Sequence, residues 1–259
     1  MGPIARRLTT ALVLAVLLAG GAAVAVAERA DTPPVSGPAT FDGRFVFVRI
    51  RYADGYAGGG FYGRQDLPWS HDYPNAEHNL MRIMSDISLL DVYMGRDGGS
   101  ILMLDDPNLF KYPFAYMSEP GYWTLSKAEE EGLRNYLLKG GFLIFDDFHA
   151  DDHWFNLETQ MKKVLPDLNW IQLEATHPVY HSFFDVDSLD DFPRQYEETP
   201  IFFGLFEHND PNGRLIAVAN HNNDIGEYWE FDGTGWFAID STNAAYKLGV
   251  NYIMYAMTH

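Results

Sequence analysis

The stretch Gly140-Gly-Phe-Leu-Ile-Phe-Asp-Asp-Phe-His-Ala-Asp-Asp-His-Trp154 joins a short apolar run to a strongly polar end. Residues 142–145 are apolar on both faces, which is typical of a central strand in a parallel sheet. The two glycines before them are suited to end a helix. In an open α/β sheet, ligands bind just beyond the carboxyl ends of the strands. The four aspartates and two histidines of this stretch therefore mark the place where a site is expected.

Strand-like and helix-like segments alternate on both sides of this stretch. The predicted strands are residues 45–52, 91–94, 101–104, 114–117, 142–145, 170–173, 201–206 and 215–219. The predicted helices begin at Asn75, at the capping box formed by Ser126 and Glu129, at residue 155 and near Thr242. Such alternation predicts a three-layer α/β sandwich with a mostly parallel central sheet.

The first 27 residues have the pattern of a cleavable signal peptide. Arg6 and Arg7 form a positive start, residues 8–18 are almost wholly apolar, and small residues precede a cleavage point near Ala27. The two arginines also leave the twin-arginine route open. The alternative is an uncleaved anchor, but the apolar part is shorter than the ~20 residues that span a membrane. We therefore predict export to the periplasm or the extracellular space, with no membrane span in the mature chain.

The rest of the chain is expected to be a linker over residues 28–40 and a single domain over residues 41–259. The formal net charge is -18, and it falls to -20 without the leader, which contains two arginines and no acid. This charge argues against nucleic acid as a partner, because like charges repel. The chain has no cysteine, which excludes disulfides, thiolate metal sites and cysteine nucleophiles.

The polar end of the opening stretch offers two kinds of site. Asp146 and Asp147 are candidate ligand-binding residues, although in strand geometry they point to opposite faces and would not form a simple pair. His149 and His153 are four residues apart and would share one face of a helical turn, so with Asp152 they are candidate ligands of a divalent metal. The alternative is a solvated helix start, in which aspartates of the first turn complement the helix dipole.

A second histidine pair, His177 and His181, has the same spacing. Pro178 disfavours a helical conformation at His177, so both rings are expected to satisfy backbone groups of a loop. A ligand-facing role for one of them is the alternative.

Asp224, Glu227 and Trp229 lie in an acidic segment after the strand at residues 215–219. We expect this segment to be a loop. It could bind a hydroxylated ligand or a cation, or it could cap its own turn with its carboxylates, and the sequence leaves both open.

Four segments together resemble a known family: Asp105-Asp-Pro-Asn-Leu-Phe-Lys-Tyr-Pro-Phe-Ala-Tyr116, Leu137-Leu-Lys-Gly-Gly-Phe-Leu-Ile-Phe-Asp-Asp147, His177-Pro-Val-Tyr-His-Ser-Phe183 and Asn223-Asp-Ile-Gly-Glu-Tyr-Trp-Glu230. They look like the domain-of-unknown-function family numbered 4159. That family is similar in fold to class I glutamine amidotransferases, which implies a flavodoxin-like sandwich. The resemblance supplies no activity, and the lack of a cysteine excludes glutamine hydrolysis through a thioester.

The segment after the first strand is longer here than the family's usual glycine-rich segment. It covers residues 54–73, and its aromatic side chains could cover the edge of the sheet or pack on their own domain. These side chains are Tyr56, Phe61, Tyr62, Trp69 and Tyr73.

Two functions of different class remain. The first is a secreted, non-catalytic module that binds a carbohydrate or a protein partner at the carboxyl edge of the sheet. The second is a metal-assisted hydrolase that uses aspartates and histidines at the strand ends. The absence of a complete catalytic signature, such as a G-x-S-x-G elbow or a P-loop, favours the first. The scattered acids and histidines keep the second open, with a divalent metal as its cofactor.

Overall fold

The structure is a computed structural model that describes residues 41–54, 67–95, 98–190 and 192–259, which belong to one compact unit. Several predicted features lie outside these residues and stay predictions. They are the leader over residues 1–27 with its cleavage point near Ala27, the linker over residues 28–40, and the aromatic residues Tyr56, Phe61 and Tyr62.

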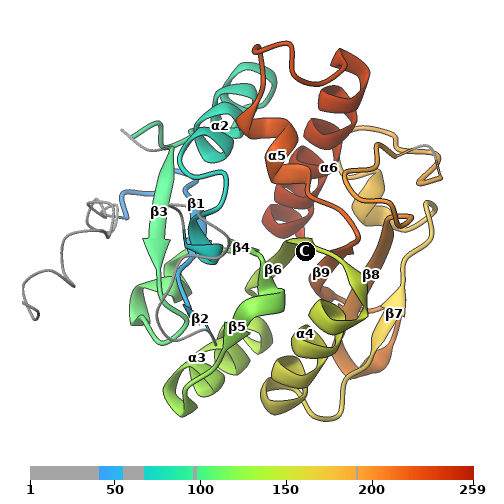
Figure 1. Cartoon of the computed structure of the whole chain (residues 1–259). Coiled ribbons are helices and arrows are strands. Elements are labelled where there is room, and N and C mark those ends of the chain that lie inside the picture. The colour runs from blue at the N-terminus through green and yellow to red at the C-terminus, as the bar shows by residue number, and fades with distance from the viewer. Residues whose placement is uncertain (1–40, 55–66, 96–97, 191) are drawn as a thin grey trace, which may run out of the picture. The chain divides into compact units, whose positions relative to one another are not determined.

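Seven strands form the central sheet in the order β3-β1-β4-β6-β9-β8-β7 (Figure 1). The first five are parallel to their neighbours, and β8 is antiparallel to both β9 and β7. The strands are β1 Phe47–Ile50, β3 Gly99–Leu102, β4 Phe114–Ser118, β6 Phe142–Phe148, β7 Trp170–Gln172, β8 Ile201–Phe206 and β9 Leu215–His221. A separate antiparallel pair is β2 Ala53–Asp54 with β5 Trp123–Thr124. The predicted α/β class with a mostly parallel sheet is thus confirmed.

Helices cover both faces of the sheet, and Figure 1 shows one group above the strands and one below. In the first group, α2 Asn75–Ile87, α5 Ile225–Glu230 and α6 Ile239–Thr258 contact one another. In the second, α3 Lys127–Leu138 contacts α4 Ala150–Val164. The short 3-10 helices are η2 Pro68–Ser70, η3 Pro107–Lys111, η4 Pro120–Tyr122, η5 Pro178–Tyr180 and η6 Glu207–Asn209.

β6 lies in the middle of the sheet, between β4 and β9, and all of its residues are buried. Phe142 and Ile144 join the core cluster that includes residues of α2, α5 and α6. Phe145 packs instead against Trp123, with ring centroids 5.7 Å apart. The strand continues past the predicted end to Phe148, with a register shift against β9. Asp146 and Asp147 therefore belong to the strand itself.

Helix α4 begins earlier than its predicted start at residue 155. It begins at Ala150, and Asp151 and Asp152 lie in its first turn. Their carboxylates complement the positive end of the helix dipole, which favours a helix start at this point.

Other predicted boundaries also need correction. The acidic segment after β9 is not a loop, because Asp224 caps the short helix α5. Helix α6 begins at Ile239 rather than near Thr242. Residues 91–94 contribute a single parallel bridge, between Val92 and Phe45, instead of a strand.

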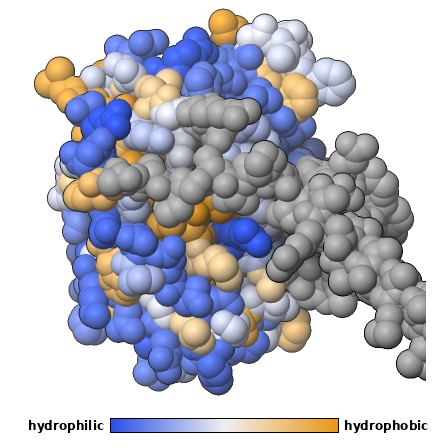
Figure 2. Space-filling model, turned by 90° about the vertical axis from the view of Figure 1, so that its left-hand side faces the viewer, coloured by the Kyte–Doolittle hydropathy of each residue, from blue (hydrophilic) through white to orange (hydrophobic). Residues whose placement is uncertain are grey.

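In the described part of the chain, no helix is both long and apolar enough to cross a membrane. Figure 2 shows the side of the molecule that lies to the left in Figure 1, where hydrophilic residues dominate and apolar ones form small groups. Some apolar side chains, such as those of Leu89 and Met103, are exposed. Isolated exposed apolar residues are common on protein surfaces and need no partner.

Candidate functional site

A cavity of about 400 Å³ opens at the carboxyl edge of the parallel strands. Glu119, Asp147 and Asp224 line it, and they lie just after β4, near the end of β6 and after β9, respectively. His71 and Glu227 line it as well. Loops that follow parallel strands meet at one edge of a sheet, so residues far apart in sequence converge there.

Asp146 is a buried anchor beside this cavity. Its oxygens accept hydrogen bonds from Tyr116 Oη at 2.8 Å, Asn220 Nδ2 at 2.9 Å, and the amides of Ile225 and Gly226 at 3.0 Å each. Burial raises the pKa of Asp146 to about 7, while the hydrogen bonds from Asn220 and Tyr116 act to lower it. The two amides are the first of α5, so Asp146 fixes the start of this helix.

Asp147, by contrast, faces the cavity. Its Oδ2 accepts from His71 Nδ1 at 2.6 Å and from Ser118 Oγ at 3.1 Å, and its Oδ1 accepts from Tyr196 Oη at 2.7 Å. Burial acts to raise the pKa of Asp147, but the hydrogen bond and charge of His71, with further hydrogen bonds, bring it down to about 2. Asp147 is therefore a carboxylate at neutral pH. Among the described residues, Asp147 shares no hydrogen-bond partner with Asp146, so the two do not form a simple pair.

A buried ion pair between Arg49 and Glu77 supports the turn that presents His71. Arg49 Nη1 donates to the carbonyl of His71 at 2.8 Å and to that of Trp69 at 3.2 Å. The guanidinium also lies over the ring of Tyr116, 4.9 Å from its centroid. Arg49 Nη2 and Glu77 Oε2 are buried without a hydrogen-bond partner among the described residues. The contacts that do form hold the backbone at residues 69–71.

Asp72 is the least satisfied acid of the site. It is 3% exposed, and neither carboxylate oxygen has a hydrogen-bond partner among the described residues. The ring of His71 lies close by, with its Nδ1 3.4 Å from Asp72 Oδ1. Burial raises the pKa of Asp72, and so does the negative charge of Asp147. A buried carboxylate without hydrogen bonds is costly and calls for a counter-charge.

Asp224 shares this environment. Its Oδ1 accepts from the amide of Glu227 at 2.9 Å, which caps helix α5. Burial raises the pKa of Asp224, and the charges of Asp147 and Asp72 raise it further.

Donor atoms of His71, Asp72, Asp147 and Asp224 all lie within 4.8 Å of one another. In the described part of the chain, two groups of possible metal ligands are this compact. The second shares Asp72 and adds Glu227 and Glu230. The first group joins one imidazole to three carboxylates, a donor set that suits first-row divalent cations.

Backbone strain also gathers around the cavity. Five non-glycine residues near it have positive φ angles: Asp72 (65°), Glu119 (46°), Asp147 (58°), Ala150 (61°) and Asn222 (59°). Asn222 Oδ1 accepts from the amide of Ala150 at 3.0 Å, which ties two of them together. Such conformations are costly and persist where the surrounding structure holds them, often at functional sites.

Aromatic rings form another part of the cavity wall. His149 stacks on Tyr196 with ring centroids 4.1 Å apart, and Tyr122 meets His153 edge-on at 4.7 Å. Burial lowers the pKa of His153, so its ring is mostly neutral at pH 7. The cavity thus combines carboxylates with ring faces.

A family model described as a domain of unknown function (DUF4159) matches residues 46–257. The chain belongs to the DUF4159 family. No curated protein is significantly similar to it. The family's name gives no activity, so the function has to be argued from the cavity.

The DUF4159 chain does not bring the predicted metal ligands His149, Asp152 and His153 into one cluster. His149 precedes helix α4 in an extended conformation, so its four-residue spacing from His153 does not place both on one helical face. The two rings meet edge-on, 5.1 Å apart, and Asp152 is exposed in the first helical turn.

Three further candidates do not line the cavity of this DUF4159 chain. His177 Nδ1 accepts from the amide of Val179 at 3.1 Å, and His181 Nε2 donates to the carbonyl of Ala175 at 2.8 Å. Both rings therefore satisfy loop backbone, as their sequence predicts. Trp229 is fully buried in the core.

Sequence reasoning missed His71, Asp72, Glu119 and Tyr196. The first two lie in the segment of residues 54–73, whose aromatic side chains were expected either to cover the edge of the sheet or to pack on their own domain. The segment also contains the polar run Ser70-His71-Asp72. A usable signal exists for Glu119, because it directly follows the end of the parallel strand β4, whereas His71 and Asp72 lie well beyond β1, after β2 and η2. Tyr196 lies outside the helices and strands, and no local pattern marks it.

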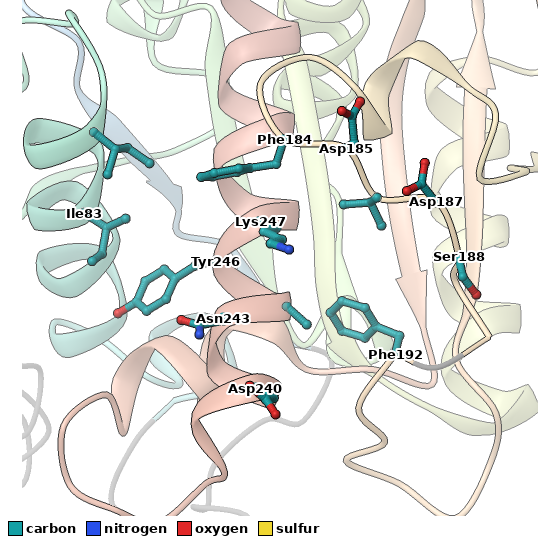
Figure 3. A pocket seen from close by; sticks show the side chains of 13 residues that line it. Ile83, Phe184, Asp185, Asp187, Ser188, Phe192, Asp240, Asn243, Tyr246 and Lys247 are labelled. Carbon is teal, nitrogen blue, oxygen red and sulfur yellow. The ribbon is translucent and has the colours of Figure 1, made fainter.

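A second hollow, of about 650 Å³, lies between α2, α6, residues 184–188 and Phe192 (Figure 3). Ile83 of α2 and Tyr246 of α6 line it together with Phe184 and Phe192. Neither compact group of possible metal ligands in the described residues lies there. The acidic cavity is therefore the stronger candidate site of the DUF4159 chain.

Proposed function

We propose that this DUF4159 chain binds a small hydroxylated ligand of the carbohydrate class in the acidic cavity. The observation that supports this is the combination of carboxylates and ring faces in one cavity of about 400 Å³. Sugar hydroxyls donate hydrogen bonds to carboxylates such as Glu119 and Glu227, and the apolar faces of sugar rings pack on aromatic rings such as Tyr122. The volume falls in the range of small-molecule sites.

We further propose that the fold is flavodoxin-like. Numbered along the chain, the five parallel strands follow the order 2-1-3-4-5, which is that of flavodoxin-like sheets. In such sheets ligands bind where the strand order reverses, which here is between β1 and β4. His71 follows β1 and Glu119 follows β4, so this topology supports a ligand site between them. The leader-like sequence of residues 1–27 supports a role outside the cytoplasm.

A metal-assisted hydrolase is the second candidate. The compact donor group of His71, Asp72, Asp147 and Asp224 favours it, because a cation held there would lie beside the carboxylates of Glu119 and Glu227. A bound cation can polarise a scissile bond, and a neighbouring carboxylate can act as general base.

Calorimetric titration of the purified chain with a panel of mono- and oligosaccharides, in the presence of a chelator, tests the carbohydrate proposal. Tyr122→Ala should weaken sugar binding by about tenfold or more, because it removes a ring from the cavity wall. Phe155→Ala is the control, since Phe155 is 70% exposed and does not line the cavity. Absence of binding to every sugar would overturn the proposal in favour of a protein partner. Release of sugar fragments after addition of metal would favour the hydrolase.

A further inference from the structure

We propose that His71, Asp72, Asp147 and Asp224 form a binding site for a divalent first-row transition metal cation, such as Mn²⁺ or Zn²⁺. This inference goes beyond carbohydrate binding and does not depend on it. The proposed ligands differ from His149, Asp152 and His153, which the sequence suggested as metal ligands.

The spacing of the donor atoms fits a single ion. Ligands of one zinc ion lie about 2.0–2.2 Å from it, so they are at most about 4.4 Å from each other. The four donor atoms all lie within 4.8 Å of one another, and the closest pair, His71 Nδ1 and Asp147 Oδ2, is 2.6 Å apart. To bind the ion, His71 Nδ1 would release the proton that it donates to Asp147, because only an unprotonated ring nitrogen is a metal ligand, and these two donor atoms would move apart.

Asp72 is an independent sign of a missing partner. Asp72 is only 3% exposed, and both of its carboxylate oxygens lack a hydrogen-bond partner among the described residues. One of its oxygens nevertheless lies within 4.8 Å of the donor atoms of the other three ligands. A cation at the centre of the group satisfies a carboxylate that the protein leaves unsatisfied, since buried charges are paired or coordinate metals.

The charges of the site call for a cation. Asp72, Asp147 and Asp224 meet only one imidazole, that of His71. The guanidinium of Arg49 also attracts Asp72, but it is paired with Glu77 and donates to two backbone carbonyls. The three carboxylates therefore outnumber the cationic groups available to them, and a divalent ion would supply the missing positive charge.

The ligands are also held in place and accessible. Ser118 and Tyr196 donate to Asp147, and the amide of Glu227 donates to Asp224. Such outer contacts orient the ligands of metal sites. His71, Asp147 and Asp224 line the cavity, which gives an ion a path from solvent.

The donor set selects among cations. Imidazole is a ligand that suits zinc, iron, copper and nickel, whereas Mg²⁺ and Ca²⁺ prefer oxygen donors throughout. One nitrogen and three carboxylates therefore favour Mn²⁺ or Zn²⁺ over Mg²⁺ and Ca²⁺.

Calorimetric titration of the metal-stripped full chain with MnCl₂ and ZnCl₂, without sugar, tests the site. We expect about one ion per chain, and Asp72→Asn should weaken binding beyond the ~10–100-fold that loss of an outer contact costs. This substitution breaks no hydrogen bond between described residues, and asparagine tolerates the positive φ of 65° at this position. Asp224→Asn is the second variant. It should weaken binding similarly while keeping the helix cap, because asparagine caps as well as aspartate does.

Asp152→Asn is the matched control. It makes the same change in the ligand set expected from sequence, outside the cavity, and the variant should bind both metals as the unmodified chain does. Circular dichroism in chelator confirms that each variant is folded. No metal binding by the unmodified chain, or equal weakening by Asp152→Asn and Asp72→Asn, would overturn the proposal. Because sugar binding is measured in chelator and metal binding without sugar, failure of one leaves the other intact.

Discussion

Replacing Asp72 with asparagine should stabilise the metal-free chain, an unusual outcome for a change at a buried residue. The carboxylate is buried and lacks hydrogen bonds, and donor atoms of Asp147 and Asp224 lie within 4.8 Å of it. Asparagine has nearly the same shape and removes one negative charge from this group. The variant therefore loses a repulsion without losing a hydrogen bond.

The size of the gain follows from the charges. At an effective dielectric constant of ~20, two like unit charges about 5 Å apart repel by about 3 kcal/mol. The substitution also removes the attraction of Asp72 to His71 and Arg49, and this loss cancels much of the gain from the removed repulsion. The buried asparagine amide also stays without partners, which costs ~1–3 kcal/mol but less than a buried ion. We expect a net gain of about 1–2 kcal/mol, or a rise in Tm of about 2–8 °C for a domain of this size.

Thermal and urea unfolding in the presence of a chelator measure this gain. Asp152→Asn is the control with the opposite sign, because loss of a first-turn aspartate costs a helix about 0.3–1 kcal/mol. With metal present, the unmodified chain should be more stable than Asp72→Asn, because it binds the metal more tightly. A ligand at 100 times its Kd stabilises a protein by about 2.7 kcal/mol. A chelated Asp72→Asn chain that unfolds at a lower temperature than the unmodified chain would refute the reasoning.

Three other predictions concern the supports of the site and the pH dependence of stability. Gly226→Ala should destabilise the chelated chain by about 1–3 kcal/mol in urea unfolding, because the added Cβ would lie 2.6 Å from Asp72 Oδ2. Arg49→Met should cost about 3–5 kcal/mol by leaving Glu77 buried and unpaired, and the double variant with Glu77→Leu should recover most of this loss. Burial lowers the pKa of His177 below its usual 6.5. The contribution of His177 to stability is therefore complete above pH 6.5 and is lost as the pH falls through its folded-state pKa. The His177→Asn variant should lose less stability than the unmodified chain when the pH falls from 7.5 to 5.

Local patterns predicted the parts of the fold that depend on neighbouring residues. The capping box at Ser126 forms as expected, with its Oγ accepting from the amide of Glu129 at 3.2 Å and its own amide donating to Glu129 Oε2 at 2.9 Å. The apolar run at residues 142–145 lies in the central strand, and Gly140 before it has a φ of 110°. These features are visible in sequence because their physical cause spans only a few residues.

Other features were hidden because their causes are not local. Helix α5 has six residues, too few for a periodic apolar pattern, and its start depends on amide hydrogen bonds to Asp146, about 80 positions away in the sequence. The contact of His71 with Asp147 joins residues 76 positions apart. No pattern within one segment reports such a contact. Only the strand order places their loops at the same edge of the sheet.

The adjacent residues Asp146 and Asp147 show how the backbone decides the role of an acid. Both are buried at the end of the same strand, yet burial raises the pKa of Asp146 to about 7, whereas the partners of Asp147 bring its pKa down to about 2. The positive φ of 58° at Asp147 breaks the regular strand and coincides with the register shift against β9. That break directs its carboxylate to His71 in the cavity, while Asp146 stays inside and binds the amides of α5. Asp146 therefore fixes the start of the helix that Asp224 caps, and Asp147 supplies a metal ligand beside Asp224. Substitution of Asp146 should weaken metal binding only by displacing Asp224.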